Sequence, residues 1–405
     1  MTNLQYLYIT DDTDVACSYK LPNVLNDRVI MAHLCWLIFL NPRLRWLDSY
    51  YDPVVDIPGC RLLAKAISGL SQLTTLEITI FCREELRFQV GAEIFFNCCP
   101  SIRKFKVVVD KPHYENRPQD WDLRDVGDTE WMVASRKEEP LTNLEDLELW
   151  EFRDSTSTEN LLPVFAHCPN LKKLTILALS EHYNHDVIGR FIGKACPKLE
   201  SLTFGSEDFE TRVEVMESLP AQQVRDIYFQ GVFDGSQASP HFSLAIQQHS
   251  KTLQTIQLTS TRDVTKISVA VILEECINLK VLIINGEDYN EDGSMCGLYA
   301  TLSDLLERPW NAVKLTRLSL SVSVCDILIG PADPPVVLSE IKEAHSSRLE
   351  EMYQRAKALK DLRDMSLDVM VLTEDEYGEL SFRAIEEPLA RSEESEESEE
   401  SDDDD

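Results

Sequence analysis

Large apolar residues recur along the chain in the spacing Leu-x-x-Leu-x-apolar. The spacing is found at twelve places, which begin at Leu4, Leu44, Leu73, Ile102, Leu144, Leu171, Leu199, Val224, Leu253, Leu279, Leu315 and Leu362. The copy at Leu44 is less complete and ends at Leu47. In the others the last two apolar positions are separated by one residue, and a period of two is typical of a strand with one buried face. From Leu144 to Leu279 successive copies start 27, 28, 25, 29 and 26 residues apart. The pattern predicts a repeat array.

Between these predicted strands the apolar residues follow a period close to 3.6, which predicts short helices. Examples are NLLPVFAHC (160–168), VIGRFIGKAC (187–196), FSLAIQQHS (242–250) and ISVAVILEEC (267–276). A strand followed by a helix at this spacing is the unit of a leucine-rich repeat, which buries its apolar face only against its neighbours. We therefore predict an α/β fold: a leucine-rich repeat solenoid, or horseshoe, with parallel strands on the concave face and helices outside.

Cysteines mark one point of several repeats, as in HCPNLKKLTI (167–176) and ACPKLESLTF (195–204). Four of them lie three residues before the first apolar position of a copy: Cys99, Cys168, Cys196 and Cys276. The sequence leaves two interpretations open, namely metal or redox ligands and small apolar side chains that pack at a helix-to-strand bend. One cysteine per repeat spreads the thiols along the axis instead of converging them, which favours packing.

The array spans residues 1–382 in this interpretation. The segment 111–140 interrupts the period and predicts an inserted loop, and a long amphipathic helix at about 336–362 is expected to cap the C-terminal end. The run VIMAHLCWLIFL (29–40) is too short to span a bilayer and predicts a buried helix. Residues 383–405 form an acidic, Ser-rich tail that has nothing apolar to bury and is expected to be disordered.

The chain is strongly acidic, with 70 acidic and 39 basic residues and a formal net charge of −31. Ten of the acids lie between Glu393 and Asp405, so the remainder keeps about −21. Such a field repels nucleic acids and anionic membranes and favours basic partners. The start lacks the pattern of a secretory signal, and eleven cysteines without one indicate reduced thiols. We expect a cytoplasmic or nuclear protein that binds neither nucleic acid nor membrane.

The Cys-Pro-x-Leu-x-x-Leu motif at this spacing resembles the repeats of F-box-type, ribonuclease-inhibitor-like leucine-rich repeat proteins of the fungal type. The resemblance covers about residues 4–367. It implies that the repeats hold a substrate for ubiquitin ligation, with cullin-type ligase subunits as further partners. An N-terminal F-box docks such proteins onto the ligase, but here Leu4 already begins a repeat. We therefore expect the docking module to be lost or to lie upstream of this chain.

Residues between the apolar strand positions should line the concave face, where exposed aromatic side chains are typical interface anchors. The expected partner-binding residues there are Tyr6, Tyr8, Trp46, Asp48, Tyr50, Lys104, Lys106, Asp146, Glu148, Trp150 and Tyr228. Trp150 beside Asp146 and Glu148 predicts a grip for a basic, partly apolar segment, although packing of Trp150 on an adjacent loop is the plainer alternative. Trp121 and Trp131 in the insertion are further candidates, against a merely solvated loop.

Motifs of catalysis are missing from the sequence: it contains no Walker loop, no GxGxxG after a strand and no GxSxG elbow. HYNHD (182–186) has His182 and His185 three residues apart, a pattern more typical of a polar loop than of a metal site. NGEDYNEDGSMCG (285–297) does not fit the calcium-loop pattern. We predict no enzyme activity, no metal and no cofactor.

Serines recur every third residue of the acidic tail, at Ser392, Ser395, Ser398 and Ser401. Asp404 lies three residues after Ser401, which resembles the site of acid-directed kinases. Each phosphate would in turn supply the charge for the preceding serine, so we expect stepwise modification from Ser401 back to Ser392. A tail that only increases solubility is the alternative.

Three functions remain open from the sequence. The first is a protein-binding scaffold whose concave face holds a basic or mixed-charge segment. The second is a stand-alone acidic regulator that binds histones or other basic proteins through its tail. The third, an enzyme that uses the 111–140 insertion, has the least support.

Overall fold

The structure is a computed structural model, and it describes residues 4–10, 24–50, 57–81, 87–110, 139–152, 158–179, 185–206, 209–231, 240–260, 265–286, 298–324, 336–374 and 380–384. Its strands are β1 (Tyr6–Thr10), β2 (Trp46–Tyr50), β3 (Thr75–Phe81), β4 (Lys104–Asp110), β5 (Asp146–Phe152), β6 (Lys173–Leu179), β7 (Ser201–Ser206), β8 (Asp226–Gly231), β9 (Thr255–Ser260), β10 (Thr265–Lys266), β11 (Val281–Gly286), β12 (Leu298–Thr301), β13 (Arg317–Ser323), β14 (Asp364–Glu374) and β15 (Leu380–Ala384).

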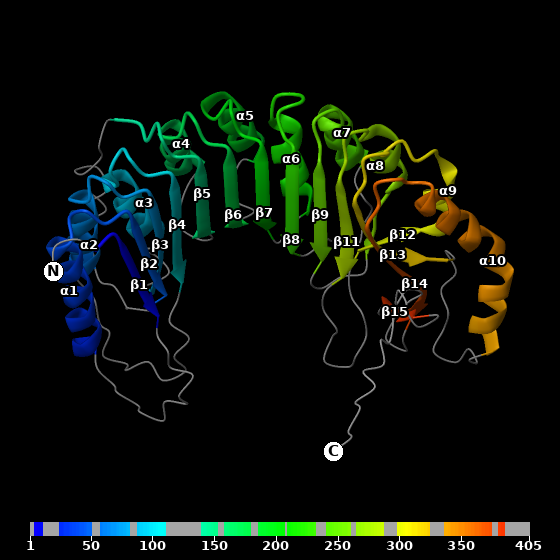
Figure 1. The fold of residues 1–405 in the computed structure, drawn as a ribbon, viewed down its shortest axis with the longest axis horizontal. Coiled ribbons are helices and arrows are strands. Elements are labelled where there is room, and N and C mark those ends of the chain that lie inside the picture. The colour runs from blue at the N-terminus through cyan, green and yellow to red at the C-terminus, as the bar shows by residue number, and fades with distance from the viewer. Residues whose placement is uncertain are drawn as a thin grey trace, which may run out of the picture.

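The helices alternate with most of these strands. They are α1 (Val24–Leu40), α2 (Ile57–Ser68), α3 (Arg87–Asn97), α4 (Thr158–Ala166), α5 (His185–Ala195), α6 (Phe209–Ser218), α7 (Pro240–His249), α8 (Ala270–Glu275), α9 (Leu302–Glu307) and α10 (Val336–Lys357). Figure 1 shows the elements as an arch, with strands along its inner side and helices along its outer side. This is an α/β fold built on one open sheet.

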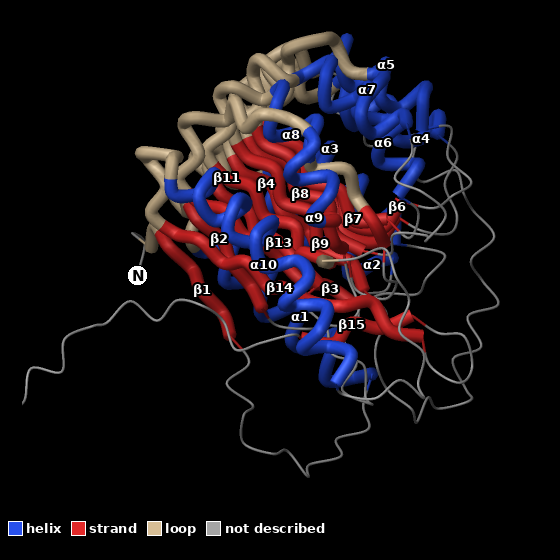
Figure 2. The backbone as a smooth tube through the Cα atoms, turned by 90° about the vertical axis from the view of Figure 1, so that its right-hand side faces the viewer, coloured by secondary structure: helices blue, strands red, loops and turns tan. Residues whose placement is uncertain are grey.

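The strands follow one another across the sheet in the order β1-β2-β3-β4-β5-β6-β7-β8-β9-β11-β13-β12-β10, and every pair along this path is parallel. Figure 2 shows them as successive members of one layer. A strand–helix–strand connection is the route that lets neighbouring strands run parallel. The alternation of periods in the sequence therefore corresponds to the chain path of the molecule.

The twelve predicted copies are twelve strands, and their central apolar residues lie side by side. The aligned residues are Leu7, Leu47, Leu76, Phe105, Leu147, Leu174, Leu202, Ile227, Ile256, Leu282, Leu318 and Met365. Leu47 to Leu318 in this row are buried, whereas the members in the end strands β1 and β14 are partly exposed. Because a shift by one residue would turn each side chain to the other face, the buried row fixes the register of the sheet.

The repeated Cys-Pro bend is a hydrogen-bonded turn. The amide of Leu171 donates to the carbonyl of Cys168 at 3.1 Å, and that of Leu199 donates to Cys196 at the same distance. Proline is favoured as the second residue of such a turn because its fixed φ suits that position. The thiol of Cys168 lies 3.2 Å from the carbonyl oxygen of Val164, inside the core. The predicted packing role agrees with this placement.

Asparagine side chains join successive turns along one rim of the sheet. The Nδ2 atoms of Asn143, Asn170 and Asn278 donate to backbone carbonyls of the preceding turn at 2.9, 2.7 and 2.7 Å. Each of these asparagines directly precedes the first leucine of a copy. The bonds satisfy carbonyl groups that a turn leaves without a ladder partner.

The expectation that residues 29–40 form a wholly buried helix is wrong for one face. Met31, Leu34, Cys35 and Ile38 are buried, but Trp36 is 59% exposed and the neighbouring Phe39 and Leu40 are exposed as well. The reason is position: α1 is the first described helix of the arch and has a helix neighbour, α2, on one side only.

The C-terminal end also differs in part from expectation. The capping helix α10 ends at Lys357, and its residues Met352 and Ala356 pack on the core. The last parallel strand, β14, continues to Glu374 and pairs antiparallel with β15, which the repeat pattern did not predict. The short strands β10 and β12 were likewise not predicted; β12 pairs with the end of β13, beyond the point where β11 stops.

Candidate protein-binding face

The side chains that alternate with the buried row point to the side of the sheet away from the helices, and we call this surface the sheet face. Its first row contains Tyr6, Trp46, Thr75, Lys104, Asp146, Lys173, Ser201, Asp226, Thr255, Val281, Arg317 and Asp364. Its second row contains Tyr8, Asp48, Glu77, Lys106, Glu148, Thr175, Thr203, Tyr228, Gln257, Ile283, Ser319 and Ser366. Figure 1 places this face on the inner side of the arch.

Aromatic side chains occupy the N-terminal corner of the sheet face. Tyr6 and Tyr8 are 62% and 65% exposed, and Trp46 is 42% exposed. The rings of Tyr6 and Trp46 contact each other in a tilted arrangement, with 6.2 Å between their centroids. Asp48 lies directly opposite Tyr8 in the register. Four predicted binding residues are therefore brought together at this corner.

Charged side chains cover the next strands in alternating signs. The Nζ atom of Lys104 lies 2.9 Å from Oε1 of Glu77, and that of Lys106 lies 3.0 Å from Oε1 of Glu148. Lys173 approaches Asp146 less closely, at 3.8 Å. Opposite charges on adjacent strands stabilise a sheet modestly, by about 0.2–1 kcal/mol per pair. The predicted residues Lys104, Lys106, Asp146 and Glu148 thus form one network.

The pKa values of two acids of the sheet face, Asp146 and Asp48, are raised. Burial raises the pKa of Asp146 above its ordinary value, although the charges of Lys173 and Lys104 oppose the rise. Its Oδ1 atom is buried and accepts no hydrogen bond. Burial also raises the pKa of Asp48, and the like charge of Glu77 directly opposite adds to the rise, while the charges of Lys104 and Lys106 on β4 partly oppose it. Both carboxylates are less stable in their ionised form than they would be in water.

Lys104 has the opposite balance. Burial works to lower the pKa of its ammonium group, but the hydrogen bond and the charge of Glu77 outweigh burial and raise the pKa. Lys104 therefore stays protonated. Lys104 forms its ion pair with Glu77. It lies two strands from Asp48, roughly 10 Å away at the usual strand spacing.

Tyr228 lies apart from these groups, on β8, three strands beyond β5 in the sheet order. Burial raises the pKa of its phenol, and the charge of Asp226 on the same strand adds to this. Between β5 and β8 the second row carries Thr175 and Thr203. The structure therefore does not bring Tyr228 together with the N-terminal residues.

Several predicted residues are not described at the level of the side chain. Tyr50 and Trp150 belong to β2 and β5, and Trp150 pairs in register with Leu177, but only their backbone is described. Trp121, Trp131 and the four serines Ser392, Ser395, Ser398 and Ser401 lie outside the described residues. So does His182, while His185 begins α5 instead of lying in a loop.

The charge balance of the sheet face is negative over the side chains that the structure describes. Its acidic members are Asp48, Glu77, Asp146, Glu148, Asp226, Asp364 and Asp368, and its basic members are Lys104, Lys106, Lys173 and Arg317. Asp364 was not among the residues predicted from the sequence. In the structure its Oδ2 atom lies 3.0 Å from Nε of Arg317. Its place between Leu362 and Met365 in the last copy is the signal that identifies it.

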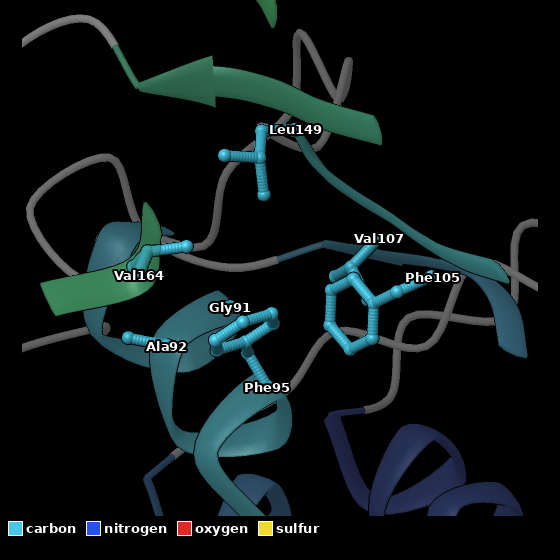
Figure 3. A pocket seen from close by; sticks show the side chains of 7 residues that line it. All are labelled: Gly91, Ala92, Phe95, Phe105, Val107, Leu149 and Val164. Atoms are coloured by element: carbon cyan, nitrogen blue, oxygen red, sulfur yellow. The ribbon is translucent and has the colours of Figure 1, made fainter. Parts of the chain in front are cut away.

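A small cavity lies inside the core near α3 (Figure 3). It measures about 10 Å³, and Gly91, Phe95, Phe105, Leu149 and Val164 are among the residues that line it. The lining residues belong to α3 and α4 on one side and to β4 and β5 on the other. An apolar space this small holds at most one water molecule, so it is a packing gap and not a ligand site.

A shallow polar depression lies between α9 and α10, lined by Lys266, Thr301, Ser303, Asp304, Leu306, Glu307 and Arg348. Asp304 accepts hydrogen bonds there from the amides of Val269 and Ala270 at 2.6 and 3.1 Å and from Oγ of Ser268 at 2.9 Å. Its carboxylate therefore fixes the start of α8, which is a structural role.

Within the described part of the chain no group of three His, Cys, Asp or Glu side chains is placed to hold a metal ion. None of the helices described there is long and apolar enough to cross a membrane. No protein-family model matches the chain, and no curated protein matches it significantly.

Proposed function

We propose that the chain is a leucine-rich repeat solenoid that acts as a non-catalytic scaffold and binds a protein partner on its sheet face. The observation that carries the proposal is the N-terminal half of that face, where exposed aromatic rings adjoin a network of charged side chains. Exposed Tyr and Trp beside polar groups are typical of binding hot spots. Three large aromatic side chains that face water together on one sheet surface form the kind of exposed patch that marks an interaction site.

The partner segment should be basic or of mixed charge, because the described side chains of the face include more acids than bases. Lys104 and Lys106 are held by Glu77 and Glu148, so they offer hydrogen-bond donors at fixed places more than free positive charge. A mixed-charge segment would exchange these pairs for its own.

The resemblance of the Cys-Pro repeats to F-box-type proteins makes substrate recognition for ubiquitin ligation the specific form of this proposal. In that form, cullin-type ligase subunits are expected among the partners. It rests on the motif alone.

The acidic tail supports a second candidate, a regulator that binds histones or other basic proteins. Ten acids in the last thirteen residues would attract such partners without any specific surface. The two candidates differ in which part of the chain the partner needs.

Affinity purification followed by mass spectrometry separates the candidates. We would compare the full chain, a chain that ends at Ala390, and the variant Thr203→Arg, which places a large cation in the middle of the sheet face. Lys194→Glu on the exposed side of α5 is the control, and circular dichroism verifies that each variant is folded.

The scaffold proposal expects the same partners with and without the tail, and their loss in Thr203→Arg only. Ligase subunits among them would support the specific form. Partners that disappear with the tail and persist in Thr203→Arg would overturn the scaffold proposal in favour of the acidic regulator.

A further inference from the structure

The aromatic corner of the sheet face contains one carboxylate, that of Asp48, without an ion-pair partner among the described residues. Asp48 forms no ion pair and no hydrogen bond with the described residues, although the acids on the next strands, Glu77 and Glu148, are both paired with lysines. Its neighbours across the register are Tyr8 on one side and Glu77 on the other. The charges of Lys104 and Lys106 act on Asp48 only from two strands away. Its carboxylate, with an aromatic ring on one side and a second acid on the other, therefore has no cation in contact.

The geometry of the corner suits a planar cation. Tyr8 is one strand from Asp48, about 4.8 Å away at the usual spacing, and Trp46 is two residues back on the same strand, about 7 Å along it. Tyr6 contacts Trp46 and extends the aromatic surface. A guanidinium group can stack on an aromatic face and at the same time donate two hydrogen bonds to a carboxylate, whereas an ammonium group does this less well.

The surroundings restrict the source of that cation. The corner is open, and a free small molecule would stay largely in water there, unlike the ligand of an enclosed pocket. A phosphate-bearing ligand would meet Asp48 and Glu77 and be repelled. An arginine side chain attached to a longer protein segment gains the additional contacts that the sheet face offers beyond the corner.

We propose that Tyr6, Tyr8, Trp46 and Asp48 form a subsite for an arginine side chain of the protein partner. This inference rests on the proposed binding function and adds the residue that the partner presents. The guanidinium stacks on the aromatic side chains and donates to the Asp48 carboxylate, and the segment that carries it continues over β3 to β5, where Lys106 and Glu148 lie.

A site-specific probe tests the subsite in the full chain without interference from the acidic tail. The protein is labelled with 5-fluorotryptophan, and the ¹⁹F resonance of position 46 is assigned by its disappearance in Trp46→Phe. N-acetyl-arginine amide is then titrated, with N-acetyl-citrulline amide as the neutral ligand of the same shape. Asp48→Asn is the test variant, and Asp226→Asn on β8 of the same face is the matched control.

We expect the resonance of Trp46 to shift with the arginine amide and not with the citrulline amide. Asp48→Asn should weaken this response about fivefold to tenfold, the range typical of one charge-assisted hydrogen bond, and Asp226→Asn should leave it unchanged. Because Asn has nearly the shape of Asp, loss of folding does not confuse the comparison, and thermal melts verify this.

Equal shifts with both amides, or an arginine response that Asp48→Asn leaves intact, would overturn the subsite. The proposed function would then still stand if Thr203→Arg removed the partners in the purification experiment. Conversely, partners that ignore every substitution on the sheet face would remove the proposed function, whatever the arginine amide does at Trp46.

Discussion

At the scale of single residues, Asp48 is expected to lower the stability of the fold although it contributes to the proposed binding site. Burial and the charge of Glu77 raise the pKa of its carboxyl group, so the ionised form is less favourable in the folded chain than in the unfolded one. A raised pKa in the folded state means that the group stabilises the fold at low pH and that this contribution is lost as the pH rises through the folded pKa. At pH 7 the ionised Asp48 therefore lowers the free energy of unfolding.

Asp48→Asn should raise the free energy of unfolding at pH 7, by about 0.5 kcal/mol, because charges still in contact with water contribute little. The gain should shrink as the pH falls towards 4, where Asp48 itself becomes protonated. Urea titrations at both pH values measure it. Glu200→Gln is the control: Glu200 lies 3.4 Å from Arg225, so removing its charge should not raise the free energy of unfolding. A destabilised Asp48→Asn protein at pH 7 would contradict the interpretation.

The cysteines allow a second prediction at this scale. Seven are described, and all are buried: Cys35, Cys60, Cys98, Cys99, Cys168, Cys196 and Cys276. Burial raises the pKa of Cys196 and of Cys276 to about 12, and that of Cys168 is raised as well. Because the thiolate is the reactive form, these thiols should resist alkylation in the native protein.

Iodoacetamide labelling with peptide mass spectrometry checks this expectation. The seven buried thiols should remain unlabelled at pH 8 until denaturant unfolds the chain, then react at ordinary rates. Rapid native labelling of Cys168 or Cys196 would show that the helix-to-strand bend is open, and the packing role would be wrong.

At the scale of elements, the sequence predicts most of the sheet because each strand repeats one physical constraint. A central apolar residue flanked by two residues of the opposite face recurs in each copy, and even the degenerate copy at Ile227 lies in register between Leu202 and Ile256. The pairing of β12 with β13 could not be predicted in this way, since β12 is not part of a copy and Ala300 pairs with Val322, after the apolar positions of the β13 copy. The antiparallel strand β15 was not predicted either, because it is not part of a copy.

The sequence predicts which residues share the sheet face but not how their side chains pair. Alternation identifies which residues share the sheet face, so Tyr6, Trp46, Lys106 and Glu148 were found from spacing alone. Spacing does not report which charges pair, and only the side-chain positions show that Asp48 is left over. The exposed outer side of α1 was not predicted either, because the pattern of apolar positions in a helix does not show whether the helix lies at the end of an array or in its middle.

Two glycines in α5 illustrate a constraint that no single helix reveals. A Cβ atom added at Gly189 would lie 2.6 Å from the carbonyl oxygen of Val215 and 2.7 Å from Cβ of Ser218, on α6. One added at Gly193 would lie 2.3 Å from Cδ of Pro220. The glycines therefore let α5 and α6 pack closely.

Gly189→Ala should lower the free energy of unfolding, by up to about 2 kcal/mol. Helix propensity alone favours Ala by about 1 kcal/mol, but the clash meets backbone atoms that cannot turn away, and overpacking of this kind costs about 1–3 kcal/mol. Gly69→Ala is the control, because its Cβ would lie at an ordinary 3.4 Å from Ala66 O and should cause no loss. Thermal or urea unfolding compares the two, and a more stable Gly189→Ala protein would contradict the close packing.

At the scale of the whole molecule, the two ends of the arch are different. The described outer residues of α10 are largely polar, such as Glu350, Gln354 and Lys357, whereas α1 exposes Trp36 and Phe39. The sheet face is also unequal, with the aromatic corner and most of its ion pairs in β1 to β6. We therefore propose that the protein partner binds on the inner side of the arch, in the N-terminal half of the sheet face.

The most direct test of this central claim is a map of contacts made by site-specific photo-crosslinking. A benzophenone amino acid replaces Tyr8 or Thr75 in the N-terminal half of the sheet face, Lys194 or Leu244 on the outer helices, or Ser395 in the tail, and captured partners are identified for each. The account predicts that the sheet-face positions crosslink one common partner and that the helix and tail positions do not. Crosslinks confined to Ser395 or to the outer helices would contradict it.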